Sequence, residues 1–177
     1  MATVVKEMPK AQLLLVGSGP EKTHLKALVQ ELDLSEVVHF EGKVDAKDVL
    51  EYYRLADVFC QPSQIPEPLS RTLLEATFFN VPVVASNVGG SLDVIQEGRN
   101  GFLAENRSAP SFAEALLKAL GGEPDPTLLK KTNATVLERF GEPYVINQME
   151  TAFEKISPSC PAAHRPFESL QKAKGFL

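Results

Sequence analysis

Residues 11–20 read Ala-Gln-Leu-Leu-Leu-Val-Gly-Ser-Gly-Pro, and this stretch decides the fold class. The aliphatic run that ends at Val16 is typical of a buried β-strand, which the glycines then interrupt. Over residues 21–32 the apolar side chains recur at the spacing of one helix face, at Leu25, Leu28, Val29 and Leu32. A strand that passes through a glycine turn into a helix predicts the first unit of an α/β fold.

The same alternation continues through residue 104. Further strands are predicted over residues 37–40, 57–60, 81–85 and 101–104. Helices are predicted between them, one from an N-cap at Asp45 and one over residues 69–79. Because the strands are apolar on both faces and alternate with helices, the sequence predicts a Rossmann-like, doubly wound parallel sheet that is covered on both sides.

The last third of the chain has a different organisation. Beyond residue 108 the periodicity predicts helices alone, over residues 110–120, 126–140 and 143–156. From Ser157 onward, three prolines within ten residues predict a loop. We therefore expect a Rossmann-like domain over residues 1–156 with a helical end, followed by a proline-containing tail over residues 157–177.

Composition limits the class of protein. The chain has 177 residues, of which 44% are hydrophobic and 23% charged, as in a soluble globular domain. Its net charge of −5 argues against a nucleic-acid or anionic membrane partner. No apolar run is long enough for a signal peptide or a transmembrane segment, and Cys60 and Cys160 form no disulfide framework. These features predict a cytoplasmic protein.

The first glycine loop is a candidate ligand site, because ligands of open parallel sheets bind beyond the carboxyl ends of the strands. Lys22 stands where the third glycine of the dinucleotide-binding pattern belongs, counting from Gly17 and Gly19. Glu21 before that lysine also breaks the phosphate-loop pattern, since a carboxylate repels phosphate. What remains is a tight turn that either lets a ligand approach the backbone or is only structural.

The loop after the third predicted strand holds a pair of carboxylates. Glu67 lies in the loop between two prolines, and Glu75 lies eight residues later, about two turns into the next helix. Two other glutamate pairs in the chain have the same spacing, so the position of this pair is what matters. The helix N-terminus favours a pyrophosphate, and a carboxylate on either side can accept hydrogen bonds from the diols of a nucleotide-sugar. Two solvated surface acids are the alternative on these grounds.

Six segments keep one order and one spacing along the chain. They are Leu13–Pro20, Val38–Gly42, Ala56–Ser63, Glu67–Ala76, Val81–Gly90 and Gly98–Leu103. Together they resemble the C-terminal domain of family 4 glycosyltransferases, with the match covering about residues 10–156. Those enzymes have two Rossmann-like domains, the GT-B architecture, and transfer a sugar from a nucleotide donor with retention and without a bound metal. The resemblance implies that this chain is the donor-binding half.

The resemblance also assigns roles to residues. It implies that Glu67 is catalytic and contacts the hydroxyls of the donor sugar, and that Glu75 holds the ribose hydroxyls. Backbone groups of Leu69, Ser70 and Arg71 would line the diphosphate. The resemblance also implies that Val44 lies against the base. Gly17 and Gly19 would form the glycine turn that faces the donor. The implied donor is a UDP-, GDP- or ADP-sugar, with no cofactor and no metal.

The chain departs from the family pattern in three ways. Pro68, Leu69 and Ser70 stand where the family commonly has Gly-Phe-Gly, so one amide is lost and backbone access is narrowed. Residues 76–80 are bulkier than the usual alanine-rich turn. The chain also begins inside a helix, at about residues 2–6. The preceding strand, the cations that neutralise the diphosphate and the N-terminal acceptor-binding domain are therefore expected to be missing.

Three cations lie near the expected pocket without occupying the matching position: Lys22, Lys43 and Arg71. We interpret them as surface charges. No histidine or cysteine has metal-ligand spacing, and Cys60 is interpreted as a small core residue. The loop at residues 87–90 either presents amides to the ligand or is a structural turn.

The sequence thus favours the donor-binding domain of a retaining hexosyltransferase-type enzyme, a fragment that binds a nucleotide-sugar and is inactive alone. The first alternative is a non-catalytic nucleotide-binding or interaction module that retains the fold, which Pro68 and Ser70 favour. The second is a dinucleotide- or ATP-binding domain, which the failed glycine patterns disfavour.

Overall fold

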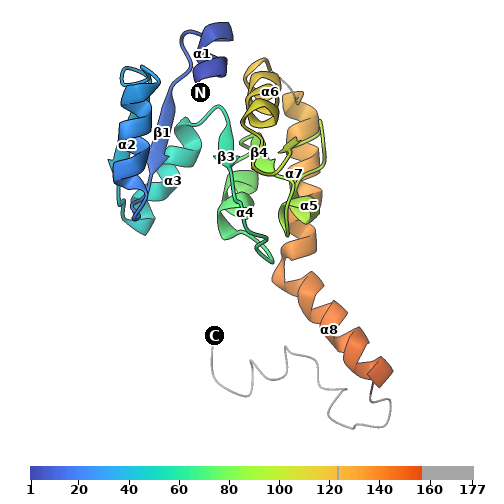
Figure 1. Ribbon diagram of the computed structural model, residues 1–177. Coiled ribbons are helices and arrows are strands. Elements are labelled where there is room, and N and C mark those ends of the chain that lie inside the picture. Colours follow the sequence, from blue (N-terminus) through green and yellow to red (C-terminus); the bar gives the residue numbers. More distant parts are fainter. Residues whose placement is uncertain (123, 157–177) are drawn as a thin grey trace. The chain divides into compact units, whose positions relative to one another are not determined.

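The computed structural model describes residues 1–122 and 124–156 (Figure 1). Its five strands are β1 (Leu13–Val16), β2 (Val38–Gly42), β3 (Phe59–Gln61), β4 (Val83–Ser86) and β5 (Gly101–Ala104). The first five helices are α1 (Ala2–Glu7), α2 (Lys22–Glu31), α3 (Ala46–Leu55), α4 (Arg71–Phe78) and α5 (Ser91–Val94). Three helices follow, α6 (Ala109–Leu120), α7 (Pro126–Phe140) and α8 (Glu142–Ile156). The predicted tail lies outside the described residues.

The predicted α/β class with parallel strands is confirmed, but the strands form two sheets. β1 pairs with β2, and β3, β4 and β5 form a second sheet in that order, with every pair parallel. Each pairing joins strands that are consecutive in the sequence and separated by a helix, which is the βαβ unit. Among the described residues, β1 and β3 each have a strand partner on one side only.

The prediction that residues 11–16 form a buried strand is wrong for part of β1. Leu14 is 41% exposed and Val16 is 40% exposed, and these alternate residues share one face of the strand. The packing around β1 is incomplete, because its sheet has two strands and the described residues of α2 include no buried side chain. All four residues of β4, in contrast, are buried. A strand in the middle of a sheet is covered where an edge strand is not.

The core lies between the three-stranded sheet and α6. Val84, Phe102 and Ala104 of β4 and β5 pack with Ala115 and Ala119, which lie four residues apart and therefore on one face of α6. Ser108 caps this helix, since its hydroxyl accepts a hydrogen bond from the amide of residue 111. The three-stranded sheet is thus packed on a buried core, and the loops after β3 and β4 extend from it.

Two local predictions need correction. Asp45 does stand at the N-cap of α3, but within the described part of the chain its side chain makes no capping hydrogen bond. The short helix α5 was not expected, because residues 91–94 cover little more than one turn and leave no helical period to detect. It begins directly after Gly90, in the loop that follows β4.

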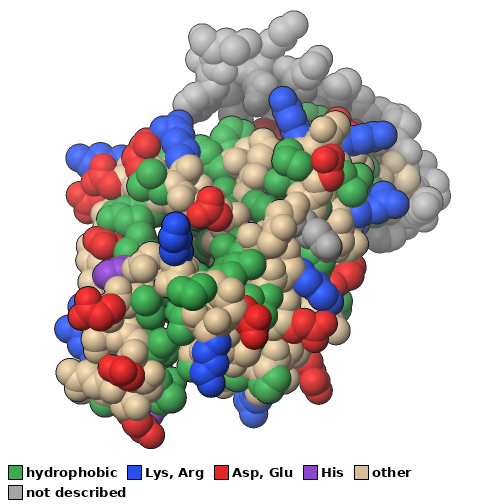
Figure 2. All heavy atoms as spheres, turned by 90° about the horizontal axis from the view of Figure 1, so that it is seen from above, with side chains coloured by type: hydrophobic (Ala, Val, Ile, Leu, Met, Phe, Trp, Pro, Cys, Tyr) green, Lys and Arg blue, Asp and Glu red, His purple; other side chains and the backbone are tan. Residues whose placement is uncertain are grey.

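The chain divides into two compact units, with the boundary after Thr135, inside α7. All five strands belong to the first unit, residues 1–135. No helix in the described ranges combines the length and the apolar character that a membrane crossing demands. On the face drawn in Figure 2, basic side chains are scattered among acidic and hydrophobic ones, and no basic stripe of the kind that binds nucleic acid forms there.

Candidate functional site

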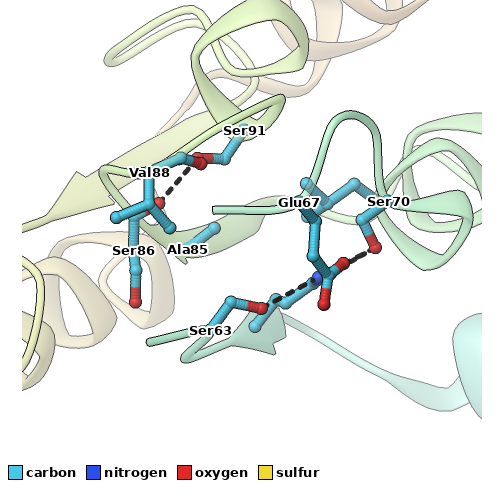
Figure 3. A pocket seen from close by; sticks show the side chains of 9 residues that line it. Ser63, Glu67, Ser70, Ala85, Ser86, Val88 and Ser91 are labelled. Carbon is cyan, nitrogen blue, oxygen red and sulfur yellow. Dashed lines mark hydrogen bonds between the residues drawn. The ribbon is translucent and has the colours of Figure 1, made fainter. Parts of the chain in front are cut away.

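The loops that follow β3 and β4 face one another at the carboxyl ends of the strands (Figure 3). From the first loop and α4 come Ser63, Glu67, Ser70 and Leu73. The end of β4, the second loop and the start of α5 contribute Ser86, Val88 and Ser91. Gln61 and Ala85 complete the lining. The cavity between them has a volume of about 10 Å³, the space of a single water molecule. A ligand larger than a water molecule therefore does not fit inside the cavity as the loops stand in this structure.

Two glycines hold these loops together. The amide of Gly90 donates a 2.8 Å hydrogen bond to the carbonyl of Glu67. A Cβ at Gly89 would lie 2.3 Å from that carbonyl oxygen, and one at Gly90 would lie 2.1 Å from the carbonyl oxygen of Pro68. Side chains at either position would push the loop away. The structure therefore gives the loop at residues 87–90 a structural role, and the alternative that it presents amides to a ligand stays a prediction.

Helix α4 begins at the floor of this site, with Ser70 at its N-cap. The hydroxyl of Ser70 makes no capping bond; it lies 2.8 Å from Nε2 of Gln61 and 2.8 Å from the hydroxyl of Thr72. Thr72 in turn donates to Oε1 of Gln61 at 2.9 Å. Because this network holds the Ser70 side chain, the first amides of α4 are left to other acceptors.

Glu75 lies one turn after Arg71 on α4. Its Oε1 accepts a hydrogen bond from Nε of Arg71 at 3.1 Å, and its Oε2 accepts one from the hydroxyl of Tyr53 at 3.0 Å. Burial of Tyr53, reinforced by this bond, raises the pKa of its hydroxyl far above the ordinary value. The tyrosine therefore stays a neutral donor to the carboxylate at physiological pH.

The sequence-predicted residues fall into four groups. Glu67 and Ser70 line the cavity; Glu75 and Arg71 lie together on the same helix. Leu69 is 39% exposed, and its Cα lies 2.8 Å from the position of a Cβ at Gly90. The cavity lining does not include Gly17, Gly19 or Val44, the residues predicted from the first two loops.

The turn after β1 is joined to the end of β2. The amide of Gly17, whose φ is +131°, donates to the carbonyl of Gly42 at 2.6 Å. The ammonium of Lys22 lies beside Gly42, 3.8 Å from the position of a Cβ there. The two cations therefore lie at different places: Lys22 lies at the carboxyl ends of β1 and β2, and Arg71 lies in the first turn of α4. Sequence reasoning left both as surface charges.

Sequence reasoning missed three side chains that contact the two ends of the α4 site: Tyr53, which binds Glu75, and Gln61 and Thr72, which bind Ser70. Tyr53 occupies an apolar position of a predicted helix, so its pattern indicated only a core residue. Gln61 is the one polar residue of the otherwise apolar strand β3, at its carboxyl end, and that position was the available signal. Thr72 carried no signal beyond its place in the first turn of α4.

Comparison with known proteins decides the family. Residues 1–135, three quarters of the chain, match the family model described as glycosyl transferases group 1. This chain belongs to that family. The predicted resemblance is therefore confirmed, and so is the fold, because solved glycosyltransferase structures superpose on the chain.

Three relatives of this group 1 glycosyltransferase chain illustrate the match. The N-acetyl-alpha-D-glucosaminyl L-malate synthase of Bacillus anthracis is 33% identical over 153 residues, which is 86% of this chain and 39% of that protein. The solved sucrose-phosphate synthase of Thermosynechococcus elongatus is 32% identical with a TM-score of 0.68, and the match covers 90% of this chain and 42% of that one. Anabaena HepE, solved in complex with UDP, has a TM-score of 0.71 at 23% identity and is matched over 86% of this chain and 44% of its own.

The group 1 chain therefore spans less than half the length of these relatives. In the ranges that the structure describes, no three His, Cys, Asp or Glu side chains gather as a metal-binding group.

Proposed function

We propose that this chain is the donor-binding domain of a retaining glycosyltransferase and that it binds a nucleoside diphosphate sugar between Glu67 and Glu75. One observation carries the proposal: the N-terminus of α4 lies at the strand ends, with Glu67 before it and Glu75 one turn inside it. This arrangement offers amides for a diphosphate and a carboxylate on either side for diols.

The chemistry assigned to the site is leaving-group stabilisation. As the bond between sugar and diphosphate breaks, negative charge grows on the diphosphate oxygens. The amides and the positive dipole end of α4 are already oriented towards that charge, so they stabilise it without reorganising. Glu67 accepts hydrogen bonds from the sugar hydroxyls and fixes the orientation of the ring. We assign the backbone of Leu69, Ser70 and Arg71 to the diphosphate.

The base and ribose are assigned to the neighbouring groups. Glu75 binds the ribose hydroxyls, Val44 lies against the base, and Gly17 and Gly19 form the turn that faces the donor. The structural neighbour HepE was solved in complex with UDP, which supports a nucleotide as the ligand. The proposed donor is a UDP-, GDP- or ADP-sugar, and the proposed location is the cytoplasm.

The chain matches only part of the length of its relatives, and this supports a further domain as its partner in the whole enzyme. Because it covers 39% of the Bacillus anthracis protein, we propose that an N-terminal acceptor-binding domain completes the enzyme and that residues 1–156 are the donor domain. The one-sided pairing of β1 and of β3 supports the prediction that a further strand belongs to this domain. The isolated chain is expected to bind the donor and to transfer no sugar.

The test is a binding panel by isothermal titration calorimetry with UDP, GDP, ADP, NAD and ATP. The proposal expects one nucleoside diphosphate to bind, with loss of binding in Glu75→Gln and no loss in Glu51→Gln. Glu51 is an apt control because it forms an exposed ion pair with Arg54 on α3. Tighter binding of NAD or ATP than of any nucleoside diphosphate would contradict the proposal, and sugar transfer by the chain alone would contradict its second part.

A second candidate function is a non-catalytic interaction module that keeps the fold. The small cavity of about 10 Å³ and the engagement of the Ser70 hydroxyl favour it, as does Pro68, which offers no amide. Under this alternative none of the five nucleotides binds to the chain.

A further inference from the structure

The carboxylate of Glu75 has two hydrogen-bond donors, one a buried neutral hydroxyl and the other an exposed cation. Its Oε2 meets the hydroxyl of Tyr53 from α3, and its Oε1 meets the guanidinium of Arg71 from its own helix. The two bonds have nearly the same length, 3.0 and 3.1 Å, so their lengths do not separate them. What separates them is how firmly each partner is held.

Tyr53 is fixed from three directions. Its side chain is 5% exposed, and its ring stacks on Phe79 at 5.9 Å with an interplanar angle of 7°. The ring of Phe59 lies 5.4 Å away on a tilted plane. Phe79 directly follows the end of α4. The tyrosine therefore donates a hydrogen bond to Glu75 near the middle of that helix and packs its ring against the residue at the end of it. The hydroxyl therefore has a defined place relative to α4.

Arg71 is held loosely. Its side chain is 88% exposed, and the pair that it forms with Glu75 is an i,i+4 contact on the helix surface. Pairs of this kind contribute about 0.5 kcal/mol or less. A ligand that offers two hydroxyls to Oε1 can replace the arginine at small cost, whereas replacing the tyrosine would leave a buried hydroxyl without a partner.

We infer that Tyr53 is a positioning residue: its hydroxyl anchors Oε2 of Glu75 so that Oε1 faces the ligand, and Arg71 is the partner that the ligand displaces. A carboxylate accepts about four hydrogen bonds, so anchoring one oxygen leaves capacity for a vicinal diol on the other. The inference rests on the proposed function, because the diol is the ribose of the nucleoside diphosphate. It adds a residue that the family-based assignment does not contain.

The test is a thermodynamic cycle. Tyr53→Phe keeps the ring and its stacking and removes only the hydroxyl. Affinity is measured for the nucleoside diphosphate, among UDP, GDP and ADP, that binds the wild-type chain most tightly, and for its 2′,3′-dideoxy counterpart. The matched control is Tyr52→Phe at the preceding position of α3, where the hydroxyl donates to Glu41 at 3.4 Å.

The inference expects Tyr53→Phe to weaken the ribonucleotide about three- to tenfold and to leave the dideoxy nucleotide unchanged. A merely structural role would weaken both nucleotides equally, and that result overturns the inference, as does an unchanged affinity for the ribonucleotide. Tyr52→Phe is expected to change neither. If the wild-type chain binds none of the three nucleoside diphosphates, the proposed function fails first and this inference fails with it; if only the Tyr53→Phe effect is missing, the proposed function stands.

Discussion

The carbonyl of Glu67 accepts a hydrogen bond from the amide of Gly90 over 2.8 Å. This bond fastens the loop after β3 to the loop after β4. It places the backbone of the proposed catalytic residue directly against Gly89 and Gly90, which come 22 and 23 residues later in the sequence. The position of the Glu67 carboxylate consequently depends on how closely Gly89 and Gly90 pack against this backbone.

Gly90→Ala is expected to destabilise the chain by about 2 kcal/mol or more, because its Cβ would lie 2.1 Å from the carbonyl oxygen of Pro68. That corresponds to a melting temperature lower by roughly 4–8 °C for a chain of this size. Gly19→Ala is the matched control, since nothing lies within 4 Å of a Cβ there. Thermal unfolding followed by circular dichroism measures both. Equal melting temperatures for the two variants would refute the close packing of these loops.

Glu75→Gln is expected to weaken nucleoside diphosphate binding about tenfold or more. The substitution keeps the shape of the side chain but removes the charge, and hydrogen bonds to a charged group contribute roughly 1.5–3 kcal/mol. Calorimetric titration measures the loss. Glu51→Gln, on the exposed surface of α3, should bind as the wild type does; a similar loss in both variants would indicate a general effect of net charge.

The two sheets should differ in how much stability they lose when a valine side chain is shortened to alanine. Val84→Ala, at a side chain with 0% exposure in β4, is expected to cost about 2 kcal/mol of unfolding free energy. Val16→Ala in β1 is expected to cost less than about 1 kcal/mol, because that side chain is already 40% exposed. Urea denaturation gives both values. A cost at Val16 as large as that at Val84 would mean that β1 is covered in solution.

The fold class could be predicted because it depends on local signals. Short apolar runs mark the strands, a glycine turn ends the first of them after Val16, and the helical periods between the runs fix the βαβ order. The split into two sheets could not be predicted in the same way. Leu14 and Val84 lie in equally apolar runs, and the strands and helices that pack around each of them make one 41% exposed and the other buried.

The site was predictable where the chain itself brings groups together. Glu67 and Glu75 are near in sequence, and the helix start between them follows from the pattern. Tyr53 meets Glu75 across 22 residues through the packing of α3 on α4, which no local spacing encodes. The Gly90 contact is of the same kind. Partners of this sort depend on tertiary packing, so they become visible only in three dimensions.

Tyr53 should also make the stability depend on pH in the alkaline range. Its folded-state pKa is raised above the ordinary value of about 10 by burial and by its bond to Glu75. The contribution of Tyr53 is therefore fully present below about pH 10. Above that pH the unfolded chain loses the tyrosine proton while the folded chain keeps it, so the unfolding free energy falls by up to about 1.4 kcal/mol per pH unit from this group. Urea denaturation at pH 8 and at pH 11 tests this: Tyr53→Phe is expected to lose less stability between the two than the wild type, and an identical loss would show that the Tyr53 hydroxyl is not buried against Glu75.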